Sequence, residues 1–149
     1  MKLATLKQGG RDGTLVVVNH DLSGAAIAAH IAPTLQAALD GWEQAAPRLA
    51  ELSDQLNDGG VPDAWALDLQ NLASPLPRAY QCLDGSAFLP HVERVRKARG
   101  AEVPASFLTD PLMYQAVSDG FIAPNDPIEM ASIDYGIDFE AEVIVITSD

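Results

Sequence analysis

Cysteine and basic residues are scarce in this sequence of 149 residues, and each scarcity excludes something. Cys82 is the single cysteine, so the chain cannot form an internal disulfide, and an isolated thiol fits a reducing compartment. Nine Lys and Arg stand against 21 Asp and Glu, which gives a net charge of −12. Nucleic acid and membranes are therefore not expected as partners, because phosphate groups need basic side chains to meet them.

Long apolar runs are also missing. No segment approaches the ~20 apolar residues that a membrane helix needs. Residues 1–7 contain no signal-peptide core, so we expect a cytoplasmic protein. Hydrophobic residues make up 48% of the chain and charged residues 20%, which is typical of a globular fold and argues against disorder.

The first part of the chain begins with a predicted β-hairpin. Polar and apolar residues alternate over 2–7, residues 14–19 are β-branched and apolar, and the glycine-rich residues 8–13 lie between them. Such a turn can also bind phosphate, but it lacks the Lys-Ser/Thr ending and the helix of a phosphate loop. A third short strand is predicted over 25–29.

Two helices are predicted after the strands. Thr34 is a suitable N-cap, and Pro47 suits an early position of the second helix, which Gly59 and Gly60 would end. Apolar residues recur at helical spacing in both: Leu35, Ala38, Leu39 and Trp42 in the first, Leu49, Leu52 and Leu56 in the second. This stripe could bind a partner, but core packing is the favoured interpretation. His20 and His30 have no acidic or thiol neighbours at metal-ligand spacing.

A proline-containing, linker-like stretch at 73–78 divides the chain, because a residue that precedes proline is pushed out of the helical region. Beyond it, residues 86–99 predict a helix with Ser86 as its cap and Gly100 as its stop. Asp84 lies just before this helix and His91 about two turns into it, so both can reach one rim. An imidazole near a metal-bound carboxylate can take a proton from water, although spacing alone favours two ordinary surface residues.

Two glutamates interrupt the last apolar segment. Residues 138–146 predict a strand, in which Glu140 and Glu142 share a face. Paired carboxylates on a buried strand need a compensating charge, and a hard cation such as Mg²⁺ or Ca²⁺ provides it. The alternative is an edge strand with both glutamates facing water.

Taken together, these segments resemble the fumarylacetoacetate hydrolase family. The first ~75 residues look like the small N-terminal domain of longer members. The matching elements beyond them are the proline-flanked lead-in, the Asp84–His91 element, the helix end at 95–100, the segment 110–115 and the strand at 136–142. The resemblance implies an α+β protein with a small N-terminal β-hairpin/helix domain over 1–74 and, over 75–149, the start of a mixed β-roll hydrolase domain.

The resemblance also implies roles for individual residues. Asp84, Glu140 and Glu142 would bind Mg²⁺ or Ca²⁺, with Mn²⁺ as a further candidate, and His91 would be the general base. Arg99 would meet a substrate carboxylate, and Tyr114 would line the substrate pocket. The substrate would be a 1,3-dicarbonyl acid such as fumarylacetoacetate or an acylpyruvate, cleaved at a carbon–carbon bond, as in the catabolism of aromatic compounds. A homodimer is the expected assembly.

Two departures from the family pattern qualify these expectations. Ser86 occupies the position at which many members have a substrate-contacting tyrosine. Members also draw a further aspartate ligand, a lysine and a glutamate from beyond the position of Glu142, so we expect these 149 residues to be an inactive fragment or truncated product, or to complete the site by oligomerising. A non-catalytic binding module and a related lyase or isomerase of 2-oxo acids are the alternatives.

Overall fold

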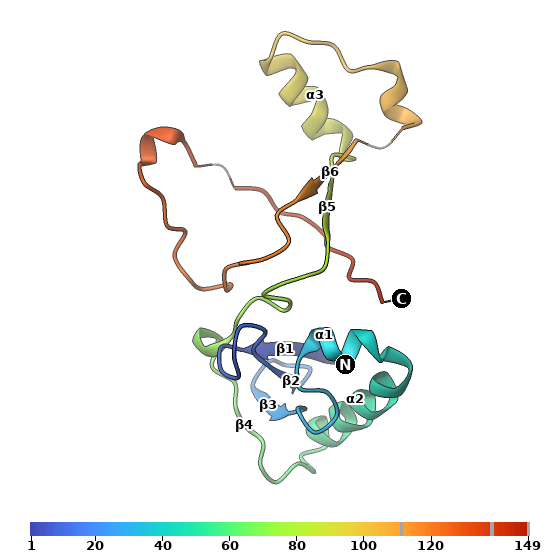
Figure 1. Cartoon of the computed structure of the whole chain (residues 1–149), viewed down its shortest axis with the longest axis vertical. Coiled ribbons are helices and arrows are strands. Elements are labelled where there is room, and N and C mark those ends of the chain that lie inside the picture. The colour runs from blue at the N-terminus through green and yellow to red at the C-terminus, as the bar shows by residue number, and fades with distance from the viewer. Residues whose placement is uncertain (111, 138, 149) are drawn as a thin grey trace. The chain divides into compact units, whose positions relative to one another are not determined.

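The computed structural model describes residues 1–110, 112–137 and 139–148, and these form a mixed α+β structure (Figure 1). The described residues contain three α-helices and two antiparallel sheets. They divide into two units that are described separately below. Unit 1 comprises Met1–Arg78 and Gly120–Asp149, and unit 2 comprises Ala79–Asp119.

Unit 1 is built on a four-stranded antiparallel sheet in which neighbouring strands follow chain order. The strands are β1 (Lys2–Leu6), β2 (Thr14–Val18), β3 (Gly24–Ile27) and β4 (Trp65–Ala66). The register places Leu3 opposite Val17 in the first pair and Val17 opposite Ala26 in the second. The hairpin and the third strand predicted from the sequence are therefore confirmed.

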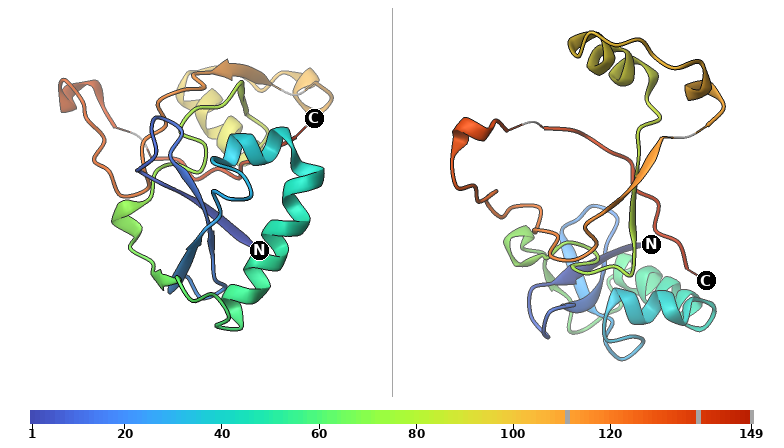
Figure 2. Two further views of the ribbon diagram at one scale, coloured as in Figure 1. Left: turned by 60° about the horizontal axis from the view of Figure 1, so that its bottom comes forward. Right: turned by 45° about the horizontal axis from the view of Figure 1, so that its top comes forward.

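Two helices, α1 (Leu35–Asp40) and α2 (Trp42–Asn57), pack against this sheet (Figure 2). Thr34 caps α1 as predicted, because its side-chain oxygen accepts a 3.1 Å hydrogen bond from the amide of Ala37. The predicted position of Pro47 is wrong, since Pro47 lies inside α2 and not near its beginning. The break between the helices occurs instead at Gly41, which ends α1 and precedes the first residue of α2.

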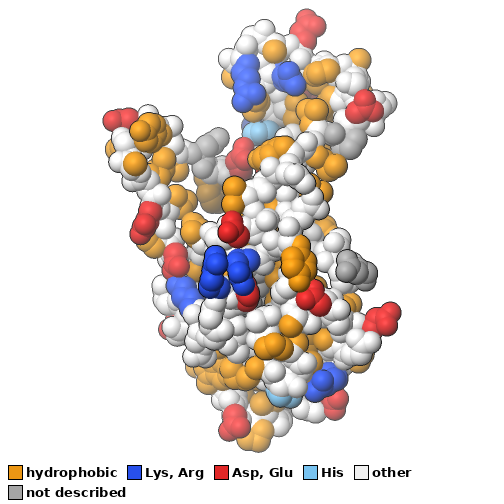
Figure 3. All heavy atoms as spheres, in the orientation of Figure 1, with side chains coloured by type: hydrophobic (Ala, Val, Ile, Leu, Met, Phe, Trp, Pro, Cys, Tyr) orange, Lys and Arg blue, Asp and Glu red, His pale blue; other side chains and the backbone are white. Residues whose placement is uncertain are grey.

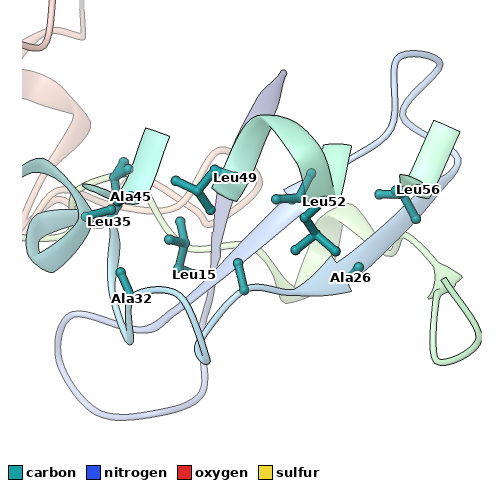
Figure 4. Packing of buried hydrophobic residues seen from close by; sticks show 11 residues of the cluster. Leu15, Ala26, Ala32, Leu35, Ala45, Leu49, Leu52 and Leu56 are labelled. Carbon is teal, nitrogen blue, oxygen red and sulfur yellow. The ribbon is translucent and has the colours of Figure 1, made fainter. Parts of the chain in front are cut away.

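The main hydrophobic core lies between the sheet and α2 (Figure 4). Leu15 and Ala26 of the sheet face Leu49 and Leu52 of α2, and Leu49 is fully buried. The apolar stripe of the helices therefore packs in the core, as the favoured interpretation predicted. None of the helices in the described ranges is long and apolar enough to cross a membrane.

The proline-containing segment after a short 3₁₀ helix, η1 (Leu69–Asn71), runs along β1. The amide of Ala73 donates a 2.8 Å hydrogen bond to the carbonyl of Thr5, and the Thr5 hydroxyl donates a 2.7 Å hydrogen bond to the carbonyl of Pro75. Thr5 is completely buried at this contact. The segment is therefore attached to the sheet of unit 1 and is not a free linker.

Unit 2 is smaller and has a two-stranded antiparallel ribbon. Its strands are β5 (Cys82–Gly85) and β6 (Met113–Ala116), and its helices are α3 (Leu89–Ala98) and the 3₁₀ helix η2 (Ala105–Leu108). Among the described residues of this unit, the buried side chains are Val92 and Phe107. Two such side chains form only a small core, so most apolar residues of unit 2 are exposed.

The predicted start of the helix at Ser86 is wrong. The Ser86 amide donates a 2.8 Å hydrogen bond to the carbonyl of Leu112, which extends the β5–β6 pairing by one step. The helix α3 begins three residues later, at Leu89, with Phe88 as its N-cap and Pro90 in its first turn. Proline is favoured there because it lacks an amide hydrogen that a first-turn residue would leave unbonded.

The strand predicted over 138–146 is not present among the described residues of that segment. Asp138 lies outside the described residues, and residues 139–148 form no helix or strand. The last element before them is the 3₁₀ helix η3 (Ile133–Tyr135). A strand forms only where a neighbouring strand provides hydrogen bonds, so the apolar, β-branched composition alone does not produce one. Val143 is 95% exposed here.

Candidate metal and catalytic site

The candidate site in unit 2 begins with a cross-strand pair. Asp84 of β5 lies directly opposite Tyr114 of β6. The Tyr114 hydroxyl donates a 2.7 Å hydrogen bond to Oδ2 of Asp84. Asp84 is half-buried, whereas Tyr114 is exposed. The bond uses one carboxylate oxygen, and a carboxylate has a second oxygen that can bind a cation.

His91 follows this pair closely in the chain. It is the third residue of α3 and lies in the first turn, so the expected position two turns into the helix is wrong. The difference arises because α3 begins at Leu89 and not at Ser86. The His91 side chain is exposed, so water can reach the imidazole.

Arg99 marks the end of the same helix. It is the C-cap of α3, and its amide donates hydrogen bonds of 3.1 Å to the carbonyls of Val95 and Arg96. Arg96 and Lys97 occupy the last turn, and basic side chains gather over α3 (Figure 3). Cations at a helix C-terminus oppose the negative end of the helix dipole, so this turn is stabilised locally and presents positive charge to anions.

A shallow apolar hollow of about 390 Å³ lies beyond the Asp84–Tyr114 pair, within unit 2. Ser86 and Leu112, which are joined by the last hydrogen bond of the ribbon, form one side of it. Leu89, Phe107 and Leu108 belong to the rest of its lining. Ser86 therefore adds a small polar side chain to a mainly apolar lining.

The remaining predicted ligands belong to the other unit. Glu140 and Glu142 are exposed residues of unit 1, whereas Asp84 belongs to unit 2. In the part of the chain that the structure describes, no three His, Cys, Asp or Glu side chains form a group that could hold a metal ion. The chemistry of the predicted set still suits a hard cation, because all three ligands are carboxylates.

The comparison with known protein families decides which family the chain belongs to. The model of the fumarylacetoacetase N-terminal domain 2 matches residues 1–78, which is more than half of the chain. The chain belongs to the fumarylacetoacetate hydrolase family. No curated protein matches the chain. The resemblance inferred from the sequence is therefore confirmed at the level of the family.

The family match and the candidate site occupy different parts of the chain. The fumarylacetoacetase N-terminal domain ends at Arg78, and all six candidate residues follow it. Their roles as metal ligands, base and substrate contacts thus stay predictions, as does the domain division at residues 74 and 75. The match does place a folded fumarylacetoacetase-type domain immediately before Asp84.

Sequence reasoning missed two contacts near the candidate residues. The pairing of Asp84 with Tyr114 was not predicted, because neither short strand has a strong periodic pattern. An ion pair between Asp12 and Arg78 was missed as well. A signal existed for the second contact, since Asp12 lies in a glycine-rich turn and Arg78 is a lone basic residue next to the prolines.

Proposed function

We propose that the chain contributes to a divalent-metal-dependent hydrolase that cleaves a carbon–carbon bond in 1,3-dicarbonyl acids of the fumarylacetoacetate or acylpyruvate type. Membership of the fumarylacetoacetate hydrolase family is the observation that carries this proposal. The Asp84–Tyr114 hydrogen bond supports it, because it joins two residues to which the family resemblance assigns roles in such a site.

Each candidate residue has a chemical task in this proposal. Asp84, Glu140 and Glu142 would hold Mg²⁺, Ca²⁺ or Mn²⁺, and a bound cation polarises a carbonyl group and stabilises a developing enolate. His91 would accept a proton from the attacking water. Arg99 would orient the substrate through paired hydrogen bonds to its carboxylate.

Tyr114 would act on the carboxylate of Asp84 and on the substrate pocket. A hydroxyl that donates to one oxygen of a carboxylate limits its rotation and thereby orients the other oxygen. The apolar hollow beside Ser86 supports a substrate with an apolar acyl group next to its charged end.

Cation binding tests the ligand set. We would titrate the purified protein with Mn²⁺ in a calorimeter and compare Asp84→Asn, Glu140→Gln and Glu142→Gln with Glu129→Gln, an exposed control on unit 1. Each ligand variant is expected to weaken binding by roughly tenfold or more, since each removes a charged oxygen donor. Unchanged affinity in all three variants would refute the ligand assignment.

Turnover tests the reaction class. We would assay the natural gene product with an acylpyruvate and with a 2-oxo diacid, each in the presence of Mg²⁺. Hydrolysis predicts pyruvate and a free carboxylic acid in equal amounts from the acylpyruvate. Decarboxylation or isomerisation of the 2-oxo diacid without acylpyruvate cleavage would support the lyase or isomerase alternative instead.

A non-catalytic binding module is the second candidate. It is favoured by one observation, namely that Glu140 and Glu142 lie outside any strand in the described range 139–148. A cation site that needs both glutamates on one strand face would then be unformed. A folded protein that binds no Mn²⁺ and turns over neither substrate class would support this candidate and contradict the hydrolase.

A further inference from the structure

The glycine-rich turn of unit 1, residues 8–13, has a role that its sequence does not indicate. It connects β1 to β2 and carries Asp12 between glycines with positive φ, namely Gly9 and Gly10 before it and Gly13 after it. At Gly13 a Cβ atom would lie 2.3 Å from the carbonyl oxygen of Leu6, so a side chain cannot be accommodated without a shift. The turn therefore requires glycine to hold its shape and present Asp12.

Asp12 and Arg78 form a bidentate ion pair. Nε of Arg78 donates to Oδ1 of Asp12 at 2.7 Å, and Nη2 donates to Oδ2 at 2.5 Å. The hydrogen bond from Arg78 holds the pKa of the Asp12 carboxyl below its usual value. Both side chains are only partly exposed. Two parallel hydrogen bonds fix orientation as well as distance, which a single-point contact does not.

Pro77, the residue before Arg78, links the segment that leaves unit 1 to the segment that returns to it. The carbonyl of Pro77 accepts hydrogen bonds from the amides of Gly120 (3.0 Å) and Phe121 (3.2 Å), all within unit 1. The returning segment is also attached further on, because Asp126 forms an ion pair with Lys7. Unit 1 thus holds together both ends of the segment that forms unit 2.

Within unit 2, the same two stretches of chain continue as a paired ribbon. The Ala79 amide donates to the Ser118 carbonyl at 2.6 Å, and the pairing reaches Asp84 and Tyr114 in β5 and β6. The base pairs Pro77 with Gly120 and Ala79 with Ser118, and the strands begin with Cys82 opposite Ala116, so the β5 side has one extra residue between the base and the strands. An antiparallel ribbon that is fixed at its base has its register fixed beyond the base, since a slip by one residue would turn side chains to the opposite face.

We propose that the Asp12–Arg78 ion pair is a positioning lock. It fixes the outgoing chain at Arg78, next to the Pro77 carbonyl that binds the returning chain, and so sets the pairing of Asp84 with Tyr114. Arg78 is a positioning residue that acts through the Pro77 carbonyl and the ribbon. The importance of the lock for cation binding rests on the proposed function. The effect of the lock on the pairing of Asp84 with Tyr114 does not. The glycine-rich turn, which lacks the ending of a phosphate loop, then binds an arginine of the same chain.

Hydrogen exchange measured by NMR tests the lock in the full chain. Arg78→Gln and Asp12→Asn are expected to speed exchange of the Gly120 and Phe121 amides, and of the Ser86 amide beyond Asp84, by about threefold or more, the range for an exposed or partly exposed ion pair. Amides of the β2–β3 pairing, at Val17 and Ala26, should not change. The double variant Asp12→Arg with Arg78→Asp restores the ion pair with its charges exchanged. Its Ser86 amide is expected to exchange within twofold of the original rate.

Arg48→Gln is the matched control, because Arg48 is also an arginine of unit 1 with a hydrogen bond distant in sequence, donated to the backbone oxygen of His30 at 3.2 Å and not to a carboxylate. Faster exchange at Gly120 with an unchanged Ser86 rate would overturn the proposal, as would a Ser86 rate that Arg48→Gln changes equally. Altered exchange at Val17 would indicate general unfolding and would also count against a local lock. If Arg78→Gln speeds exchange at Ser86 and the original protein binds no Mn²⁺, the lock is supported and only the proposed function is contradicted.

Discussion

Tyr114 lies opposite Asp84 in the β5–β6 pair, and its hydroxyl donates a 2.7 Å hydrogen bond to Oδ2 of that aspartate. The two residues are thirty positions apart in the chain, and the pairing of two short strands brings them together. Directly opposite residues of antiparallel strands have neighbouring side chains on one face. A carboxylate that is oriented in this way is better prepared to bind a cation than one that rotates freely.

The first prediction concerns this hydrogen bond. Tyr114→Phe removes the hydroxyl and keeps the ring, so the ribbon should stay paired while Asp84 gains rotational freedom. We expect Mn²⁺ affinity to fall by roughly tenfold, the lower end of what the loss of an outer hydrogen bond to a metal ligand costs. Calorimetric titration of the purified variant measures the change.

Tyr135→Phe provides the control for this measurement. Tyr135 is also an exposed tyrosine, at 79%, but it belongs to η3 in unit 1 and lies far along the chain from Asp84. Its substitution should leave Mn²⁺ affinity unchanged. Equal affinities for Tyr114→Phe and the original protein would show that the hydroxyl does not prepare Asp84 for a cation.

Local patterns predicted the elements of unit 1 correctly where neighbours in sequence supply the structure. The alternation over 2–7 and the glycine-rich turn specify β1 and its hairpin partner β2, because the pairing needs only adjacent segments. Thr34 was predictable for the same reason, since its side chain bonds an amide three residues away. Leu49 was predictable from helical spacing, and it is fully buried.

Prediction failed where a distant partner decides the structure. Ser86 has the chemistry of a helix cap, but its amide bonds the Leu112 carbonyl and so extends a ribbon. Residues 139–148 have the composition of a strand, yet the described structure gives them no strand neighbour. Pro47 is a failure of a different, local kind: it was placed at a helix start, although Gly41 supplies the break between the helices.

The second prediction concerns His91. His91→Ala should abolish carbon–carbon hydrolysis by the natural gene product, because no imidazole would accept a proton from water, and it should leave Mn²⁺ affinity unchanged, because His91 is not among the proposed ligands. Steady-state assays with an acylpyruvate measure the first effect. His30→Ala is the control, since His30 is an exposed residue of unit 1. Normal turnover in His91→Ala would remove His91 as the base.

The third prediction is a dependence of stability on pH. The hydrogen bond from Arg78 lowers the pKa of Asp12 in the folded protein below its usual value of 3.8. A carboxyl with a depressed folded pKa stabilises the protein above its unfolded pKa, and this contribution disappears as the pH falls through the folded pKa. Asp12→Asn should therefore lower the thermal midpoint at pH 6, and its effect should shrink as the pH falls from 3.8 through the lower folded pKa.

Thermal unfolding from pH 6 down to pH 2.5 checks this prediction. Asp63→Asn is the control, because Asp63 is an exposed acid without an ion pair among the described residues. The difference in midpoint between Asp12→Asn and the original protein should shrink as the pH is lowered. A difference that stays constant over this range would show that the Asp12 charge does not contribute through Arg78.

The last prediction tests the core of the fumarylacetoacetase-type domain. Leu49→Ala removes a fully buried side chain that packs among the residues of the main core, so the free energy of unfolding should fall by about 2–5 kcal/mol. Leu69 is 49% exposed, so Leu69→Ala should lower the free energy of unfolding by less than about half of that amount. Urea unfolding followed by tryptophan fluorescence reports on unit 1 alone, because Trp42 and Trp65 both belong to it. Equal losses in the two variants would mean that the packing between α2 and the sheet does not hold this domain together.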